Sequence, residues 1–285
     1  MTDVPYIEVE DYDEENYGFN VKQKGISAVN ISRGLSLEEV KEKLKKERIS
    51  SNLNITRDNL PIVGFKDIEE TPDGLKAHFI KISSLESKTI LGEDLRKQKA
   101  YFPPPNNIPI RVKMYDEATV IYFYTGSDKT AKSIISFLES EMFDTVRRVN
   151  PGNDLMSELV EENKDIIYEL DVDPEIVESA EIDGDDTLVQ IEDNTIKGSK
   201  GILVLDEEPL IENLSINSSN PPLIEGMRMK EWIDGAEDTS VVLTKVGQLK
   251  IYFPVSQFDS STYTDSDLFG ILIENFENKV LYNLI

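Results

Sequence analysis

The chain has 285 residues, 55 acidic and 30 basic side chains, a single histidine and no cysteine, which gives a formal net charge of −25. A chain of this length can bury a hydrophobic core as one large domain or two ordinary ones, so it needs neither disulfides nor metals to fold. The lack of cysteine excludes disulfide frameworks, cysteine zinc sites, iron–sulfur clusters and thiol nucleophiles. The lone His78 likewise excludes a multi-histidine metal site.

The first residues are not typical of a secreted protein. Residues 1–20 hold seven acids and no base, whereas a secretory signal begins with basic residues followed by an apolar stretch. No later segment approaches the ~18 consecutive apolar residues of a membrane span. We therefore expect a cytoplasmic or virion protein that is not secreted and has no contact with a membrane.

Most of the negative charge lies in two segments. Residues 1–20 carry a charge of −7, and residues 154–195 hold sixteen acids and one base, Lys164. Together these 62 residues account for −22 of the total charge. A salt-adapted protein would spread acids over its whole surface, whereas clustered carboxylates steer the approach of a basic partner.

The first helix is predicted by its N-terminal residues. Ser36 is followed three residues later by Glu39, a spacing typical of a capping box, so we expect an amphipathic helix over residues 37–48. Two apolar runs, residues 60–65 and 75–82, flank a Thr-Pro-Asp-Gly turn and predict a β-hairpin.

A second pair of strands is predicted over residues 108–115 and 118–124, followed by a helix over residues 131–147. The intervening turn leads from a strand through Gly126 to Lys129 at a helix start, as in a phosphate-binding loop. It lacks the glycine that such a loop needs directly before its lysine, so we expect Ser127 or Asp128 to act as an N-cap instead.

A turn at residues 150–153 marks the predicted boundary between domains. In the acidic segment that follows, apolar residues at helical spacing predict an amphipathic helix through about residue 169; they are Leu155, Leu159, Ile166, Ile167 and Leu170. The last third alternates strand patterns, at residues 188–191, 201–205, 241–246 and 249–255, with polar loops, and then predicts a helix over residues 265–276.

We therefore predict an α+β fold with mixed or antiparallel sheets and a few amphipathic helices, forming two subdomains joined by an acidic segment. The expected parts are an acidic tail (1–20), an N-terminal α+β domain (21–153), an acidic helix and linker (154–197) and a C-terminal α+β domain (198–285).

Our first functional hypothesis is a non-enzymatic interaction or assembly subunit, for example a viral or phage structural component, that docks on a basic protein surface within a larger complex. Aromatic residues interleave with acids in the N-terminal tail, as in segments that order on binding. We predict no catalytic residue, metal or cofactor. The predicted partner-binding residues are Asp154, Glu158, Glu161, Glu162, Asp165, Asp183, Asp185, Asp186, Tyr12 and Tyr17.

Two alternatives belong to other classes. The first is a nucleic-acid-related regulator or DNA mimic, with residues 21–153 carrying a charge of +4 and offering Lys41, Lys43, Lys45, Lys46, Arg96, Lys97, Arg147 and Arg148 as candidate contacts. The second is a carboxylate-dependent metal hydrolase, which needs only a concave site where two acids converge.

Overall fold

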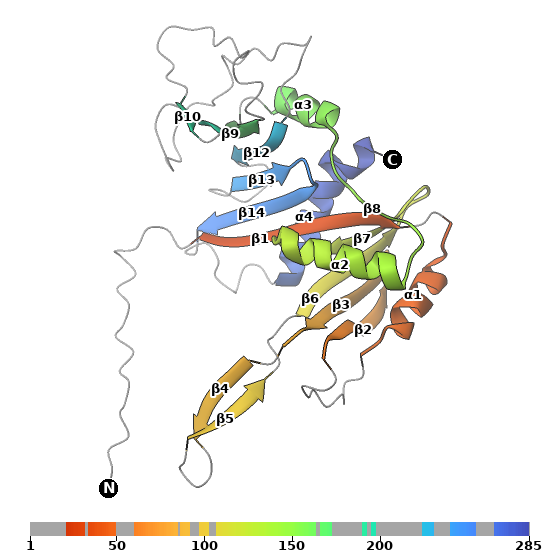
Figure 1. The fold of residues 1–285 in the computed structure, drawn as a ribbon. Helices are drawn as coiled ribbons and strands as arrows, with labels where there is room; N and C mark the ends of the chain where they lie inside the picture. The colour runs from red at the N-terminus through yellow and green to blue at the C-terminus, as the bar shows by residue number, and fades with distance from the viewer. Residues whose placement is uncertain are drawn as a thin grey trace, which may run out of the picture.

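The computed structural model describes twelve stretches of the chain, which together form an α+β fold (Figure 1). Its described part contains four α-helices and an antiparallel sheet that outweighs them, so the predicted fold class is confirmed. The described residues are 21–31, 34–49, 60–84, 86–91, 97–102, 107–163, 166–172, 190–192, 195–197, 224–230, 240–254 and 265–284.

Twelve strands form one continuous antiparallel sheet in the order β10-β11-β9-β12-β13-β14-β1-β7-β6-β3-β2, with β8 pairing beside β14 on the same side of β1. A separate hairpin of β4 and β5 projects from the body (Figure 1). The sheet strands are β1 (Val21–Ile31), β2 (Ile62–Thr71), β3 (Gly74–Ile82), β6 (Asn107–Met114), β7 (Thr119–Phe123), β8 (Val146–Arg148), β9 (Ile167–Val172), β10 (Gln190–Glu192), β11 (Thr195–Lys197), β12 (Ile224–Lys230), β13 (Ser240–Thr244) and β14 (Gln248–Pro254), and the hairpin strands are β4 (Glu86–Leu91) and β5 (Lys97–Phe102).

The 11-residue strand β1 joins the two halves of the sheet. Its residues 21–27 pair with β14, and its residues 27–31 pair with β7 on the other edge. Residues 29–31 also pair with β8, which continues the edge that β14 occupies. The sheet therefore passes without a break from residues of the predicted N-terminal domain to residues of the predicted C-terminal domain.

One face of the sheet packs against α1 (Leu37–Lys46) and α2 (Asp128–Glu141). The helices bury Val40, Leu44, Ile134 and Leu138 against this face. Phe137 of α2 contributes to a cluster of three aromatic rings, with centroids 6.0 Å from Phe65 and 5.5 Å from Phe79. Burial of these apolar side chains is the main stabilising contribution on this side of the molecule.

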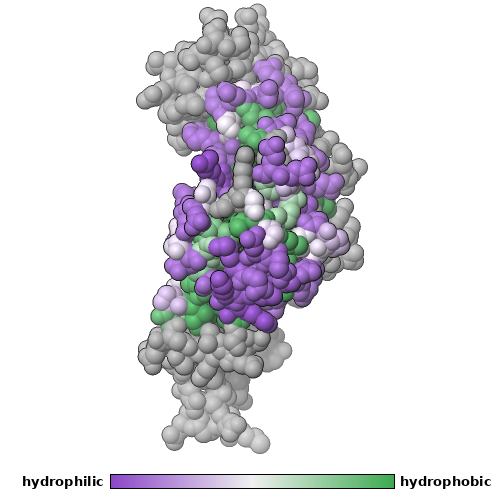
Figure 2. All heavy atoms as spheres, turned by 90° about the vertical axis from the view of Figure 1, so that its right-hand side faces the viewer, coloured by the Kyte–Doolittle hydropathy of each residue, from purple (hydrophilic) through white to green (hydrophobic). Residues whose placement is uncertain are grey.

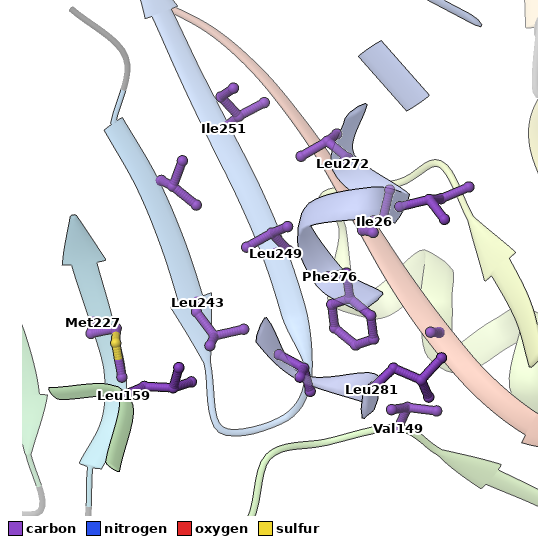
Figure 3. Packing of buried hydrophobic residues seen from close by; sticks show 14 of the residues in the cluster. Ile26, Val149, Leu159, Met227, Leu243, Leu249, Ile251, Leu272, Phe276 and Leu281 are labelled. Carbon is purple, nitrogen blue, oxygen red and sulfur yellow. The ribbon is translucent and has the colours of Figure 1, made fainter. Parts of the chain in front are cut away.

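The opposite face packs against α3 (Asn153–Glu162), α4 (Asp265–Lys279) and the short 3-10 helix that follows α4, residues Leu281–Asn283. Figure 3 shows Leu272 and Phe276 of α4 directed toward Leu249 and Ile26 on the strands. Because helices cover both faces of the sheet, all five residues of β7 are buried. Ile121 and Phe123 belong to the cluster with α1 and α2, whereas Val120 and Tyr122 belong to the cluster with α4.

Several local predictions are confirmed. Ser36 caps α1, its hydroxyl oxygen accepting a hydrogen bond from the Glu39 backbone N–H at 3.3 Å while the Glu39 carboxylate accepts one from the Ser36 N–H at 2.7 Å. Ser127 caps α2 by accepting from the Thr130 N–H at 3.3 Å. The hairpin of β2 and β3 has the predicted turn, with Thr71 paired to Gly74.

Two predicted helix ends are wrong. The helix expected to reach residue 147 ends at Glu141, and Val146–Arg148 form β8; the helix expected to reach residue 169 ends at Glu162, and β9 begins at Ile167. Both segments pair with strands that are distant in sequence, so hydrogen bonds to the sheet override their local helical pattern. The strand predicted at residues 201–205 lies outside the described residues.

Candidate functional site

Helix α3 brings four of the predicted partner-binding acids onto one exposed face. Asp154, Glu158, Glu161 and Glu162 are all exposed, and their spacing of four, seven and eight residues from the first places them within an arc of about 100° on a helix. No lysine or arginine lies in this helix. We call these four side chains the acidic face.

The opposite side of α3 fixes the helix to the sheet. Leu155, Met156, Leu159 and Val160 are buried in the cluster that also contains Met227 of β12, as Figure 3 shows for Leu159 and Met227. Two polar contacts hold its ends: the Asn153 side-chain oxygen accepts a hydrogen bond from the Ile224 N–H at 3.2 Å, and the Asn163 side-chain amide donates to the Leu159 carbonyl at 2.7 Å. The acidic face is therefore presented from a helix with a well-packed base.

The electrostatics of α3 differ between its two ends. Asp154 lies in the first turn, where the positive end of the helix dipole stabilises a carboxylate. Glu161 and Glu162 lie in the last turn, where the dipole is unfavourable for acids, and this turn contains no base. Helix stability therefore does not explain why carboxylates occupy the C-terminal end of the acidic face.

The remaining predicted partner-binding residues lie outside the part of the chain that the structure describes. These are Asp165, Asp183, Asp185, Asp186, Tyr12 and Tyr17, so their role stays a prediction.

Among the basic residues considered for nucleic acid, four have partners within the protein. Lys41 pairs with Glu38 and Glu70, and Lys45 lies 2.6 Å from the Glu42 carboxylate. Lys43 donates to the Met142 carbonyl at 2.7 Å, and Arg148 lies 2.7 Å from the Asp128 carboxylate.

A buried polar cluster between α4 and the sheet was not predicted. The Glu277 carboxylate accepts hydrogen bonds from Tyr115 and, at 3.3 Å, from Tyr122, and it lies 2.9 Å from the Lys113 ammonium group. The Glu277 side chain is only 8% exposed. One signal was available in the sequence: Glu277 lies four residues after the buried Ile273, on the apolar face of the helix.

Burial and hydrogen bonding shift the pKa values in this Glu277 cluster. Burial lowers the pKa of Lys113, but the hydrogen bond and charge of Glu277, with a smaller contribution from Asp73, outweigh it and raise that pKa above 10.5. Burial, followed by interactions with the neighbouring groups, raises the pKa values of Tyr115 and Tyr122 far above their usual range. The cluster therefore consists of one ion pair and two neutral tyrosines, and it attaches α4 to β6 and β7.

A shallow hollow of about 440 Å³ lies between α2 and the end of the β2–β3 hairpin that is distant from its turn. Its lining includes three lysines, Lys81, Lys129 and Lys132, and no carboxylate. Within the described stretches, no group of three or more histidine or acidic side chains has the arrangement of a metal site. The converging pair of acids that a carboxylate-dependent hydrolase requires is thus not part of this hollow.

Figure 2 shows one face of the molecule; among its coloured residues, hydrophilic ones cover more of the surface than hydrophobic ones, which form smaller patches between them. None of the helices in the described ranges combines the length and the apolar character needed to cross a bilayer. No protein-family model, curated protein or solved structure matches the chain.

Proposed function

We propose that the chain is a non-enzymatic interaction or assembly subunit that binds a basic protein surface through the acidic face of α3. The observation that supports the proposal best is the exposure of four carboxylates on one side of a helix whose other side is buried. The chain would then be, for example, a viral or phage structural component, in the cytoplasm or in a virion, that uses this surface to contact its neighbours.

The charge arrangement fits recognition better than it fits stability. A basic partner would place ammonium and guanidinium groups opposite the acidic face, relieving both the mutual repulsion of the carboxylates and their unfavourable position at the helix C-terminus. Electrostatic complementarity of this kind raises the association rate and favours partners of opposite charge.

The experiment is capture of protein partners from an extract of the source organism, divided into a nuclease-treated and an untreated half, on tagged wild type and on the variant E158Q/E162Q. We expect the wild type to retain a lysine- or arginine-rich protein that the variant loses, with binding that weakens as salt increases. Because the variant removes two carboxylates that helix α3 does not need, its free energy of unfolding should equal or exceed that of the wild type.

The matched control is E139Q/E141Q on α2. Glu139 and Glu141 are also exposed acids near a helix C-terminus that lacks bases, so this control changes the net charge equally. Equal retention of the partner by all three proteins would reject the acidic face as the binding surface. Partners that disappear on nuclease treatment would instead support the nucleic-acid alternative.

A further inference from the structure

The hollow on α2 gathers cationic and hydroxyl groups at helical spacing. Lys129, Lys132, Ser133, Ser136 and Ser140 follow one another at intervals of three, one, three and four residues, which places them on one side of the helix. The β3 residue Lys81 completes the polar lining and donates a hydrogen bond to the Ser133 hydroxyl at 2.6 Å.

Two of the three lysines have no carboxylate partner among the residues that the structure describes. Neither Lys81 nor Lys129 forms an ion pair with any residue that the structure describes. Lys132 differs, because its ammonium group lies 2.6 Å from the Asp128 carboxylate, and it is not counted among the ligand contacts. The lining therefore offers ammonium and hydroxyl donors without a competing acid.

Asp128, which would repel an anion in a phosphate-binding loop, is already engaged. Its carboxylate lies 2.6 Å from the Lys132 ammonium group and 2.7 Å from the Arg148 guanidinium group. Hydrogen bonds from these two bases hold the pKa of Asp128 below 3.8. Asp128 does not line the hollow. Its negative charge is therefore compensated within the protein.

An apolar wall lies beside these donors. Val63 and the half-buried Phe137 line the hollow, and Phe137 is held in place by Phe65 and Phe79. The volume of about 440 Å³ falls in the range of roughly 300–1,000 Å³ that is usual for small-molecule sites. The combination matches a molecule with a phosphate group at one end and an apolar or planar part at the other.

We propose that this hollow binds a phosphate-bearing small molecule. Lys81 and Lys129 contact the phosphate oxygens, the Ser136 hydroxyl donates a hydrogen bond to one of them, and Phe137 contacts the non-phosphate part. Ammonium groups bind phosphate as point charges, and hydrogen bonds to charged groups are the stronger ones. This site is independent of the acidic face of α3.

Isothermal titration calorimetry of the full chain with sodium tripolyphosphate, ATP and a single-stranded DNA oligonucleotide tests the proposal. We expect tripolyphosphate and ATP to bind, and K81Q/K129Q to weaken both by about tenfold or more, since each lost charge-assisted hydrogen bond reduces affinity several-fold. Tighter binding of ATP than of tripolyphosphate would identify a nucleotide, and equal binding would identify a free phosphate chain.

The control is K46Q/K250Q, which removes the same charge at two lysines that do not line the hollow. It should bind as the wild type does. Should K81Q/K129Q unfold, the single variant K129Q tests the site, because Lys129 is exposed and supports no described contact. Binding of the oligonucleotide alone, no binding of tripolyphosphate and ATP, or equal losses in both double variants would overturn the proposal.

Discussion

The carboxylate of Glu277 on α4 lies 2.9 Å from the ammonium group of Lys113 on β6. Glu277 is almost completely buried, so this ion pair lies in an environment that screens charge poorly. Tyr115 and Tyr122 donate to the same carboxylate oxygen, which gives the buried charge three partners. The pair therefore adds a polar link between α4 and β6 to the apolar contacts that the same helix makes with the sheet.

Replacing Glu277 by glutamine should destabilise the protein. The variant E277Q leaves Lys113 with Asp73, at 3.5 Å, as its remaining acidic partner among the described residues, and it replaces the charged acceptor of two tyrosine hydroxyls by a neutral amide oxygen. Breaking a buried pair on one side costs about 3–5 kcal/mol, and the partial exposure of Lys113 reduces this to about 2–4 kcal/mol. Urea denaturation measures the change.

The control for this variant is E274Q on the same helix. Glu274 is exposed, so its replacement should change the free energy of unfolding by less than about 0.5 kcal/mol. Equal stabilities of E277Q and E274Q would show that the Glu277 cluster contributes nothing to the fold.

The same cluster predicts a loss of stability at alkaline pH. Lys113, Tyr115 and Tyr122 have raised pKa values in the folded state, so folded protein holds their protons more tightly than unfolded protein does. Their contribution is complete below the ordinary values of 10.0 and 10.5 and is lost as the pH rises above them. Each group contributes a slope of up to about 1.4 kcal/mol per pH unit.

The variant Y115F tests this pH dependence, because phenylalanine cannot ionise. The free energy of unfolding should fall less between about pH 8 and pH 11 in Y115F than in the wild type. Superimposable profiles of Y115F and wild type would contradict the assignment.

Gly270 offers a stabilising substitution. It is exposed in the middle of α4, and a Cβ atom added there meets no atom within 4 Å. Alanine has a higher helix propensity than glycine and reduces the freedom of the unfolded chain, so G270A should raise the free energy of unfolding by about 0.5–1 kcal/mol. A lower thermal midpoint for G270A would show that α4 needs glycine for another reason.

Gly247, in the turn between β13 and β14, should respond in the opposite direction. Its φ is +70°, and an added Cβ would lie 1.9 Å from the Val149 carbonyl oxygen. An alanine in a left-handed backbone conformation costs roughly 1–2 kcal/mol. We expect G247A to lower the free energy of unfolding by more than this, because the main chain must also shift to make room for the Cβ atom. G152A, at a glycine with open space and φ of −65°, is the matched control and should cost less.

Features that depend on neighbours in the sequence could be predicted. The Ser36–Glu39 cap joins residues three positions apart, and the acidic face of α3 follows from helical spacing alone. Strand β8 could not be predicted from the sequence, because Val146–Arg148 become a strand only when Val29–Ile31 lie beside them. The Glu277 cluster was missed for the same reason, since Lys113 and Glu277 meet only in the complete fold.

The position of β1 has a consequence for how the protein folds. Ser27 pairs with Gln248 on one edge and with Phe123 on the other, so the centre of the sheet consists of contacts between residues far apart in the chain. Such high contact order slows folding, because long loops must close before the contacts stabilise them. During synthesis, the β14 edge of β1 stays unpaired until residues 248–254 have been made, and Lys22 and Lys24 on this segment reduce its tendency to pair with other chains in the meantime.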